Sequence, residues 1–257
     1  MALFVRVVVY YVLMWVFLII LGGTSQAVGL PVEVGVAQWG PGIAALLMLL
    51  IFRKDGLRLT LVNPDTPFSR YVLAFAVPLA LSAVIYGVSR LLPPTAAPSA
   101  WAVVTSLPML LIWIPFGALG EEIGWRGYLQ IRLDVRLNGF TSSLIVAALW
   151  APMHIHLFSN GLLYIALFFI TLMGYSLVLY ALLHDTGFSV LIATVFHLAI
   201  NYGNLLYFDV LNAPSLMLIS ALVWGIAAGV TVYQRRAIFF GRPERAPTGP
   251  IGAVAEG

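Results

Sequence analysis

LLYIALFFITLMGYSLVLYALL, residues 162–183, is a run of twenty-two residues without a charged side chain. A helix needs about 20 predominantly apolar residues to cross the hydrocarbon of a bilayer, so this run is long enough to span a membrane. The rest of the chain has the same character, with further apolar runs at residues 3–21, 36–52, 71–92, 101–120, 141–158, 189–207 and 215–233. We therefore predict an all-α fold, a polytopic transmembrane helical bundle of about eight spans.

The composition supports this class. Hydrophobic residues make up 61% of the 257 residues and charged residues only 9%, whereas soluble domains carry about 25% charged residues. Cysteine is absent, which excludes a disulfide framework, thiolate-bound zinc and a thiol nucleophile. The net charge of +3 does not indicate a nucleic-acid partner, because the basic residues lie mostly at the ends of the apolar runs.

The basic residues also predict the orientation of the chain. Cytoplasmic loops carry an excess of Lys and Arg, and most basic residues fall on one side if both termini are cytoplasmic: Arg53, Lys54, Arg58, Arg70, Arg132, Arg136, Arg235, Arg236, Arg242 and Arg245. Arg90 is the exception. The first run resembles a signal peptide in part, but its length favours retention as a span.

The chain is expected to form a single transmembrane domain over residues 1–240, with the catalytic core at about 101–207. Residues 241–257 are rich in Pro, Gly and Ala, which predicts a disordered cytoplasmic tail. The expected location is the cell membrane of a prokaryote, as a multi-pass protein.

Three charged residues follow the fourth apolar run. A charged side chain near the centre of a membrane helix costs about 2.5–3.5 kcal/mol, so such residues usually face a protein interior and mark function. Glu122 and Arg126 are four residues apart, the favourable spacing for an ion pair on one helix face, which leaves Glu121 pointing elsewhere. The alternative is a helix end at the lipid headgroups, with all three side chains solvated.

Two later runs carry the other polar candidates. His154 follows Pro152, which should bend the helix and open room beside the imidazole. His197 and Asn201 are four residues apart and share a helix face. Each alone is explained better by a hydrogen bond between helices than by catalysis. Together with Glu121 they supply a carboxylate, imidazoles and an amide, the groups that hydrolysis requires.

These residues resemble the motifs of the CPBP family of intramembrane proteases, which includes the type II CAAX prenyl endopeptidases and the Abi-like bacteriocin-processing proteins. EEIGWR at residues 121–126 is similar to EExxxR, and HLAIN at residues 197–201 is similar to HxxxN. His154 ends a third motif, in which Trp150 stands where the family commonly has Phe. The resemblance covers about residues 101–207.

The resemblance implies a role for each matched residue. Glu121 would be the general base for the attacking water, assisted by His154, and His197 with Asn201 would stabilise the oxyanion. Glu122 and Arg126 would support the site. Four large side chains are candidates for the substrate pocket, although such residues usually serve only packing: Trp125, Trp150, Met153 and Phe196.

The sequence does not decide whether a metal ion takes part in the mechanism. Glu121, His154 and His197 offer three ligands that could hold zinc, and the family is often labelled metalloprotease. Their spacing is not the compact HExxH pattern, which favours a metal-free mechanism that depends on the glutamate.

The leading hypothesis is an intramembrane endopeptidase acting on a peptide or membrane-protein substrate in the lipid bilayer, from a cavity open to cytoplasmic water. The first alternative is a non-catalytic immunity or peptide-binding protein. The second is a proton-coupled transporter, which also uses intramembrane carboxylates but would ordinarily show an internal repeat.

Overall fold

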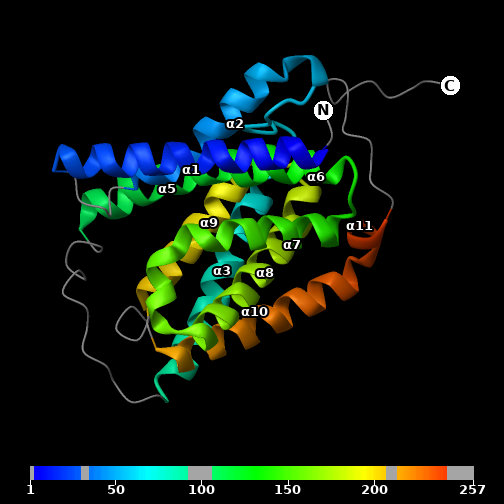
Figure 1. Cartoon of the computed structure of the whole chain (residues 1–257). Helices are drawn as coiled ribbons and strands as arrows, with labels where there is room; N and C mark the ends of the chain where they lie inside the picture. Colours follow the sequence, from blue (N-terminus) through cyan, green and yellow to red (C-terminus); the bar gives the residue numbers. More distant parts are fainter. Residues whose placement is uncertain (1–2, 30–34, 92–105, 207–212, 242–257) are drawn as a thin grey trace.

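The computed structural model describes residues 3–29, 35–91, 106–206 and 213–241, and all the regular secondary structure in these ranges is helical (Figure 1). Five helices are long and apolar enough to cross a membrane. They are α1 (Leu3–Ala27), α3 (Phe68–Ser89), the continuous helix Gly139–Asn160, α8 (Leu162–His184) and α10 (Pro214–Gln234). The all-α prediction is therefore confirmed.

Two expected spans are shorter helices. Residues 36–51 form a 3-10 turn, Val36–Trp39, followed by α2 (Gly40–Ile51), and residues 190–204 form α9 (Val190–Asn204). The expected span at 101–120 begins outside the described residues. Short segments complete the structure at Arg53–Asp55 and at α11 (Arg236–Phe240).

The helix that carries the carboxylate doublet does not end at the doublet. It runs from a π-helical turn, Met109–Trp113, through α5 (Ile114–Gly124) and a second π-helical turn, Trp125–Gln130, to α6 (Ile131–Asp134). Single π-helical turns within α-helices occur frequently at functional sites. Glu121 and Glu122 therefore lie inside the bundle, and the alternative of a solvated helix end is wrong for them.

The fifth apolar run contains the expected bend. The α-helical part, α7 (Gly139–Trp150), gives way to 3-10 turns over Ala151–Asn160, and His154 has non-helical backbone angles of φ −92° and ψ 36°. Proline removes a backbone donor and disfavours helical geometry before it, which accounts for the change of helix type at Pro152.

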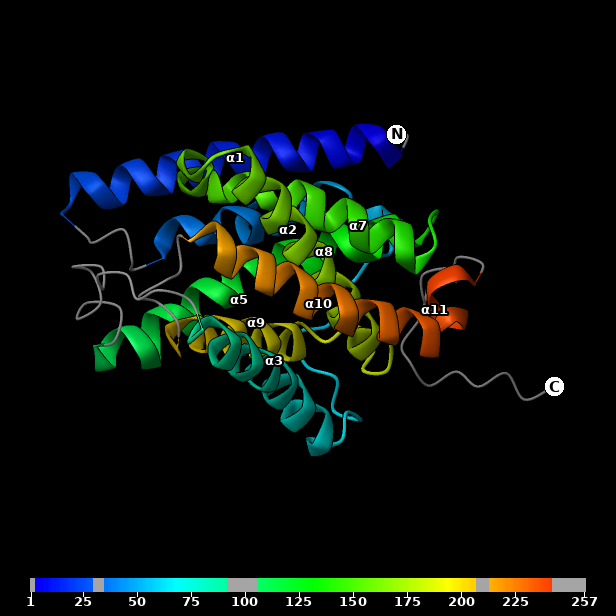
Figure 2. The same ribbon diagram turned by 90° about the horizontal axis from the view of Figure 1, so that it is seen from below.

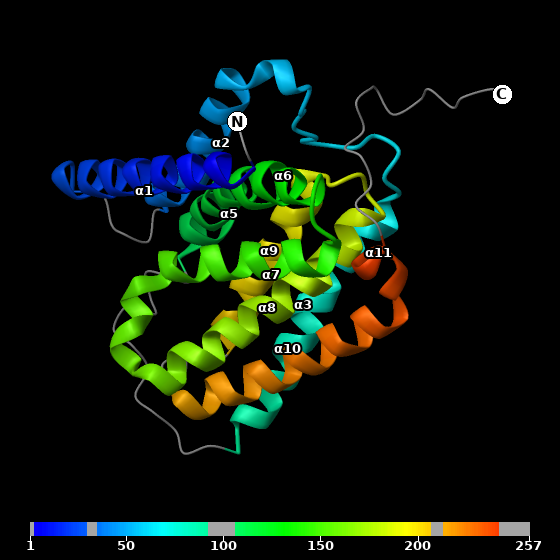
Figure 3. The same cartoon turned by 45° about the vertical axis from the view of Figure 1, so that its right-hand side comes forward.

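The helices pack against one another as a bundle. Helix α1 packs on α2, α2 on α5, α3 on α9, and α8 on α10. Viewed from below, α1 and α3 lie at opposite edges of the bundle (Figure 2), and Figure 3 shows α10 running obliquely across the front. Helices α2 and α5 approach closely at Gly124, where a Cβ would lie 2.4 Å from Pro41 Cβ.

Ion pairs gather the basic residues at one end of the bundle. Asp55 binds Arg6 and Arg132, and Asp185 binds Arg70 and Arg235. The backbone N–H groups of Val190 and Leu191 donate to the carbonyl oxygens of Thr60 and Leu61. These bonds link the loop after Asp55 to the start of α9 and so connect the two clusters. We call this the arginine-rich end; in Figure 1 it is the side where α6 and α11 lie.

Candidate active site

A buried ion pair stands at the centre of the site. Arg126 Nη1 donates to Glu122 Oε1 over 2.8 Å, and His197 Nδ1 contacts the same oxygen at 2.8 Å. The Glu122 side chain is 0% exposed and that of Arg126 only 3%. Arg126 also donates to Ser176 Oγ and lies 4.5 Å from the centroid of the Trp150 ring. The predicted pair of Glu122 and Arg126 is present, and α9 supplies a third member, His197.

Glu121 makes a different set of contacts. Trp150 Nε1 donates to its Oε2 over 2.6 Å, and Gln38 Nε2 donates to its Oε1 over 2.9 Å. The residue is 2% exposed. Each carboxylate oxygen thus has one neutral N–H donor, whereas Glu122 has the cationic partner. The doublet is chemically asymmetric.

Gln38 was not among the residues singled out from the sequence. It lies in the 3-10 turn before α2, 83 residues from Glu121 along the chain. Gly117, one helical turn before Glu121, leaves room for it, because a Cβ there would lie 1.8 Å from Gln38 Oε1. A glutamine in an apolar run is a weak signal, and only the packing of α2 on α5 shows its partner.

The Trp150 ring contacts both histidines. Its centroid lies 5.8 Å from that of His154 and 5.3 Å from that of His197. His154 Nδ1 is buried and makes no side-chain hydrogen bond among the described residues. The structure therefore brings Glu121, Glu122, Arg126 and His197 together and places His154 beside the Trp150 indole, without a direct hydrogen bond to Glu121 among the described contacts.

The remaining sequence candidates differ in their surroundings. Asn201 is partly exposed, one turn beyond His197 on α9. Trp125 is fully buried with its ring edge toward Tyr10, and Phe196 packs against Trp224. Met153 is half-buried at the edge of the core. Trp125 and Phe196 are packing residues in this arrangement, whereas Trp150 contacts the polar site directly.

The fit of a zinc ion can be tested on these contacts. Within the described ranges, no three His, Asp or Glu side chains stand close enough together to hold a metal ion. Both oxygens of Glu121 accept N–H bonds, and His197 Nδ1 is bonded to Glu122. The three candidate ligands, as arranged here, do not fit a three-ligand zinc site.

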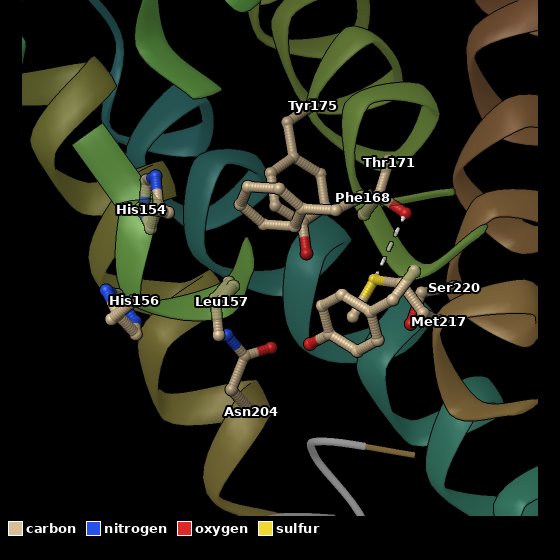
Figure 4. A pocket seen from close by; sticks show the side chains of 10 residues that line it. His154, His156, Leu157, Phe168, Thr171, Tyr175, Asn204, Met217 and Ser220 are labelled. Carbon is tan, nitrogen blue, oxygen red and sulfur yellow. Dashed lines mark hydrogen bonds between the residues drawn. The ribbon is translucent and has the colours of Figure 1, made fainter. Parts of the chain in front are cut away.

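A cavity of about 210 Å³ reaches His154 (Figure 4). Its walls come from α8, α9, α10 and the 3-10 turns after α7. Tyr164, Phe168 and Tyr175 give it aromatic surface, and the polar groups of Thr171, Asn204 and Ser220 are distributed around it. We call it the His154 cavity. None of its lining residues is a carboxylate, a lysine or an arginine.

The segment of the chain that matches known proteins contains this site. Residues 103–203 match the family described as type II CAAX prenyl endopeptidase, Rce1-like. The chain is also 22% identical over 144 residues to CAAX prenyl protease 2 of Methanococcus maripaludis, an alignment that covers 52% of each chain. The chain thus spans about half the length of this curated relative. The six motif residues all lie inside the family match.

Proposed function

We propose, from the match of residues 103–203 to the Rce1-like family, that this chain is an intramembrane endopeptidase. It hydrolyses a peptide bond at or within the membrane. The substrate class that the relative's name describes, a CAAX prenyl protein, is one candidate, and any peptide or membrane-protein segment that can enter the bundle is another.

The observation that supports this function best is the asymmetry of the doublet. Glu122 is neutralised by Arg126 and bonded to His197, and so serves to hold α5 and α9 together. Among the described residues, Glu121 has no cationic partner within hydrogen-bond distance, and two N–H donors orient it. A carboxylate held in a fixed direction in an apolar surrounding is suited to act as a general base.

The chemical steps follow from these positions. Glu121 accepts a proton from water as the water oxygen attacks the scissile carbonyl carbon, and the carbonyl oxygen becomes an oxyanion. The Asn201 amide can donate a hydrogen bond to that oxyanion without first taking up a proton. His197 can add a second donor from Nε2 when its ring is doubly protonated. Collapse of the intermediate breaks the C–N bond, and Glu121 returns its proton to the leaving amine.

His154 assists from beside the Trp150 indole. It lines the His154 cavity, so a water molecule or a substrate carbonyl in that cavity can approach its ring. This role does not need a direct contact with Glu121, because a bridging water transmits a proton between groups that are too far apart to bond directly.

The membrane arrangement is part of the proposal. The helices of residues 36–51 and 190–204, with the segment that ends at α6, add three spans to the five long helices, which gives eight spans in one domain over residues 1–240. Both termini are then cytoplasmic, as the arginine-rich end supports. The tail expected at 241–257 lies outside the described residues except for Gly241.

The test is a comparison of protein termini in membranes of cells that make the wild type or Glu121→Ala. Termini that appear only with the wild type identify the substrates. Asp65→Ala is the control, because it removes an exposed carboxylate from a loop and should give the wild-type pattern. Identical termini for the wild type and Glu121→Ala would refute proteolysis and favour a non-catalytic peptide-binding role. Zinc content and chelator sensitivity of the purified protein would test the metal-free form of the mechanism.

A further inference from the structure

We propose that a groove between α7, α8 and α10 binds one anionic phospholipid, with an acyl chain along α10 and the phosphate at Arg236. The groove has a volume of about 690 Å³ and follows the second half of α10 to α11, at the arginine-rich end. We call it the α10 groove. It shares no lining residue with the His154 cavity, so this binding site goes beyond the proposed proteolysis and does not depend on it.

Three helices form the groove, and α11 lies at its end. Helices α7 and α10 both pack on α8, and Figure 3 shows the three helices with α11 following α10. Phe240 of α11 contacts Phe140 of α7, with the ring centroids 5.2 Å apart. Apart from Arg236 and Tyr233, every lining residue is apolar or a glycine. The groove is therefore suited to a hydrocarbon chain.

Two glycines of α10 leave the groove open. Gly174 of α8 is required by packing, because a Cβ there would lie 2.8 Å from Trp224 Cβ. A Cβ at Gly225 or Gly229 would meet no atom within 4 Å. Packing among the described residues thus does not require glycine at these two positions, although glycine is unfavourable inside a helix. Small residues in membrane helices allow another molecule to approach the backbone closely, so this space is available to a molecule outside the chain.

The length of the groove corresponds to one leaflet of a bilayer. Along α10 its lining extends from Gly225 to Tyr233, which is about 12 Å at a rise of 1.5 Å per residue. The hydrocarbon of a bilayer is about 30 Å thick, so one leaflet contributes about 15 Å. The volume of about 690 Å³ also lies within the range of about 300–1,000 Å³ that holds whole small ligands. An acyl chain that extends from the headgroup toward the middle of the bilayer fits these dimensions.

A second copy of the chain is a less suitable occupant. Leu222 and Leu218 lie three and seven residues before Gly225, on the same face of α10, and are 57% and 47% exposed. Close packing of two membrane helices uses small residues at the interface, and here the small residues begin only at Gly225. The first half of α10 therefore offers no close contact to a helix that spans the whole bilayer, whereas the second half is open to a chain in one leaflet.

Arg236 supplies the charge that selects an anionic headgroup. It is exposed, and among the described residues it makes no ion pair or side-chain hydrogen bond. The adjacent Arg235 binds Asp185, and Arg70 binds the same carboxylate, so this acid is already paired. A guanidinium binds phosphate through two parallel N–H groups, and the exposed Tyr233 adds a hydroxyl donor. The end of the groove thus complements a phosphate at the level of the lipid headgroups.

Native mass spectrometry of the purified full chain measures this site directly. The protein is titrated with phosphatidylglycerol, which is anionic, and separately with phosphatidylcholine, which is zwitterionic, both with the same acyl chains. The wild type should retain one phosphatidylglycerol about fivefold more tightly than phosphatidylcholine. This ratio corresponds to about 1 kcal/mol, the contribution of one basic residue at an anionic membrane surface.

Two pairs of variants separate the headgroup from the chain. Arg236→Gln should bind both lipids equally, whereas Arg58→Gln, which changes an exposed arginine outside the groove, should keep the preference. Gly229→Leu should retain neither lipid, because its side chain fills the groove. Gly87→Leu is its control, since a Cβ there also meets no atom within 4 Å but lies on α3, and it should bind as the wild type does. Leucine favours a helix more than glycine, so both leucine variants should remain folded.

The proposal is overturned if the wild type shows no preference between the lipids, if Arg236→Gln keeps the preference, or if Gly229→Leu retains lipid as Gly87→Leu does. A wild-type dimer without bound lipid, which Gly229→Leu converts to a monomer, would also overturn it and would assign the groove to a second copy of the chain. Lipid retention is measured without a peptide substrate, so its outcome and that of the proteolysis experiment are independent.

Discussion

The hydrogen bond from Trp150 to Glu121 can be removed with little change in packing. Trp150→Phe retains an aromatic ring, and with it part of the stacking under Arg126, but eliminates the N–H that lies 2.6 Å from Glu121 Oε2. A hydrogen bond to an ionised group contributes about 1.5–3 kcal/mol, and about 1.4 kcal/mol corresponds to a factor of ten. If the bond orients Glu121 for proton transfer, turnover should fall about ten- to hundredfold.

The assay compares the rate at which wild-type and variant proteoliposomes release a Glu121-dependent product. Trp224→Phe is the matched control, because the Trp224 indole is also fully buried but its Nε1 has no partner in the described residues. That variant should keep its turnover per folded molecule. Wild-type turnover in Trp150→Phe, alongside an inactive Glu121→Ala, would refute the positioning role.

Three further predictions concern stability and are measured by thermal unfolding in detergent. Arg126→Ala leaves Glu122 buried without its cation and should cost about 3–5 kcal/mol; a loss under about 1 kcal/mol would contradict a buried pair. Gly124→Ala should destabilise, because its Cβ would lie 2.4 Å from Pro41, whereas Gly225→Ala, with no atom within 4 Å, should be neutral or slightly stabilising. Asp134 accepts hydrogen bonds from Ser142 Oγ and Gln130 Nε2. Asp134→Ala removes the acceptor of both bonds and should cost about 1–3 kcal/mol, and an unchanged unfolding temperature would contradict these contacts.

The local features of the site could be predicted from the sequence. The spacing of Glu122 and Arg126 places both on one helix face, and the structure has the ion pair. Pro152 predicts a break in the helix, and the backbone departs from helical angles at His154. Both inferences depend only on residues within one turn of each other, where helix geometry decides the outcome.

The contacts between distant segments could not be predicted in this way. Gln38 reaches Glu121 across 83 residues and His197 reaches Glu122 across 75. The role of Trp150 as a hydrogen-bond donor to Glu121 was likewise missed, since the sequence indicated Trp150 only as a candidate for the substrate pocket. Helical periodicity indicates which face of a helix is buried but not which segment packs against it. Four segments enclose the His154 cavity, so no local sequence pattern predicts it.

The central claim is that the two adjacent glutamates have different roles. Single-turnover hydrolysis by wild type, Glu121→Gln and Glu122→Gln, each corrected for the folded fraction, tests it most directly. The account predicts that Glu121→Gln loses about 10²–10⁴-fold, the usual contribution of a general base, with normal unfolding, and that Glu122→Gln mainly loses stability. Equal rates for Glu121→Gln and the wild type, or loss of the chemical step in well-folded Glu122→Gln alone, would contradict it.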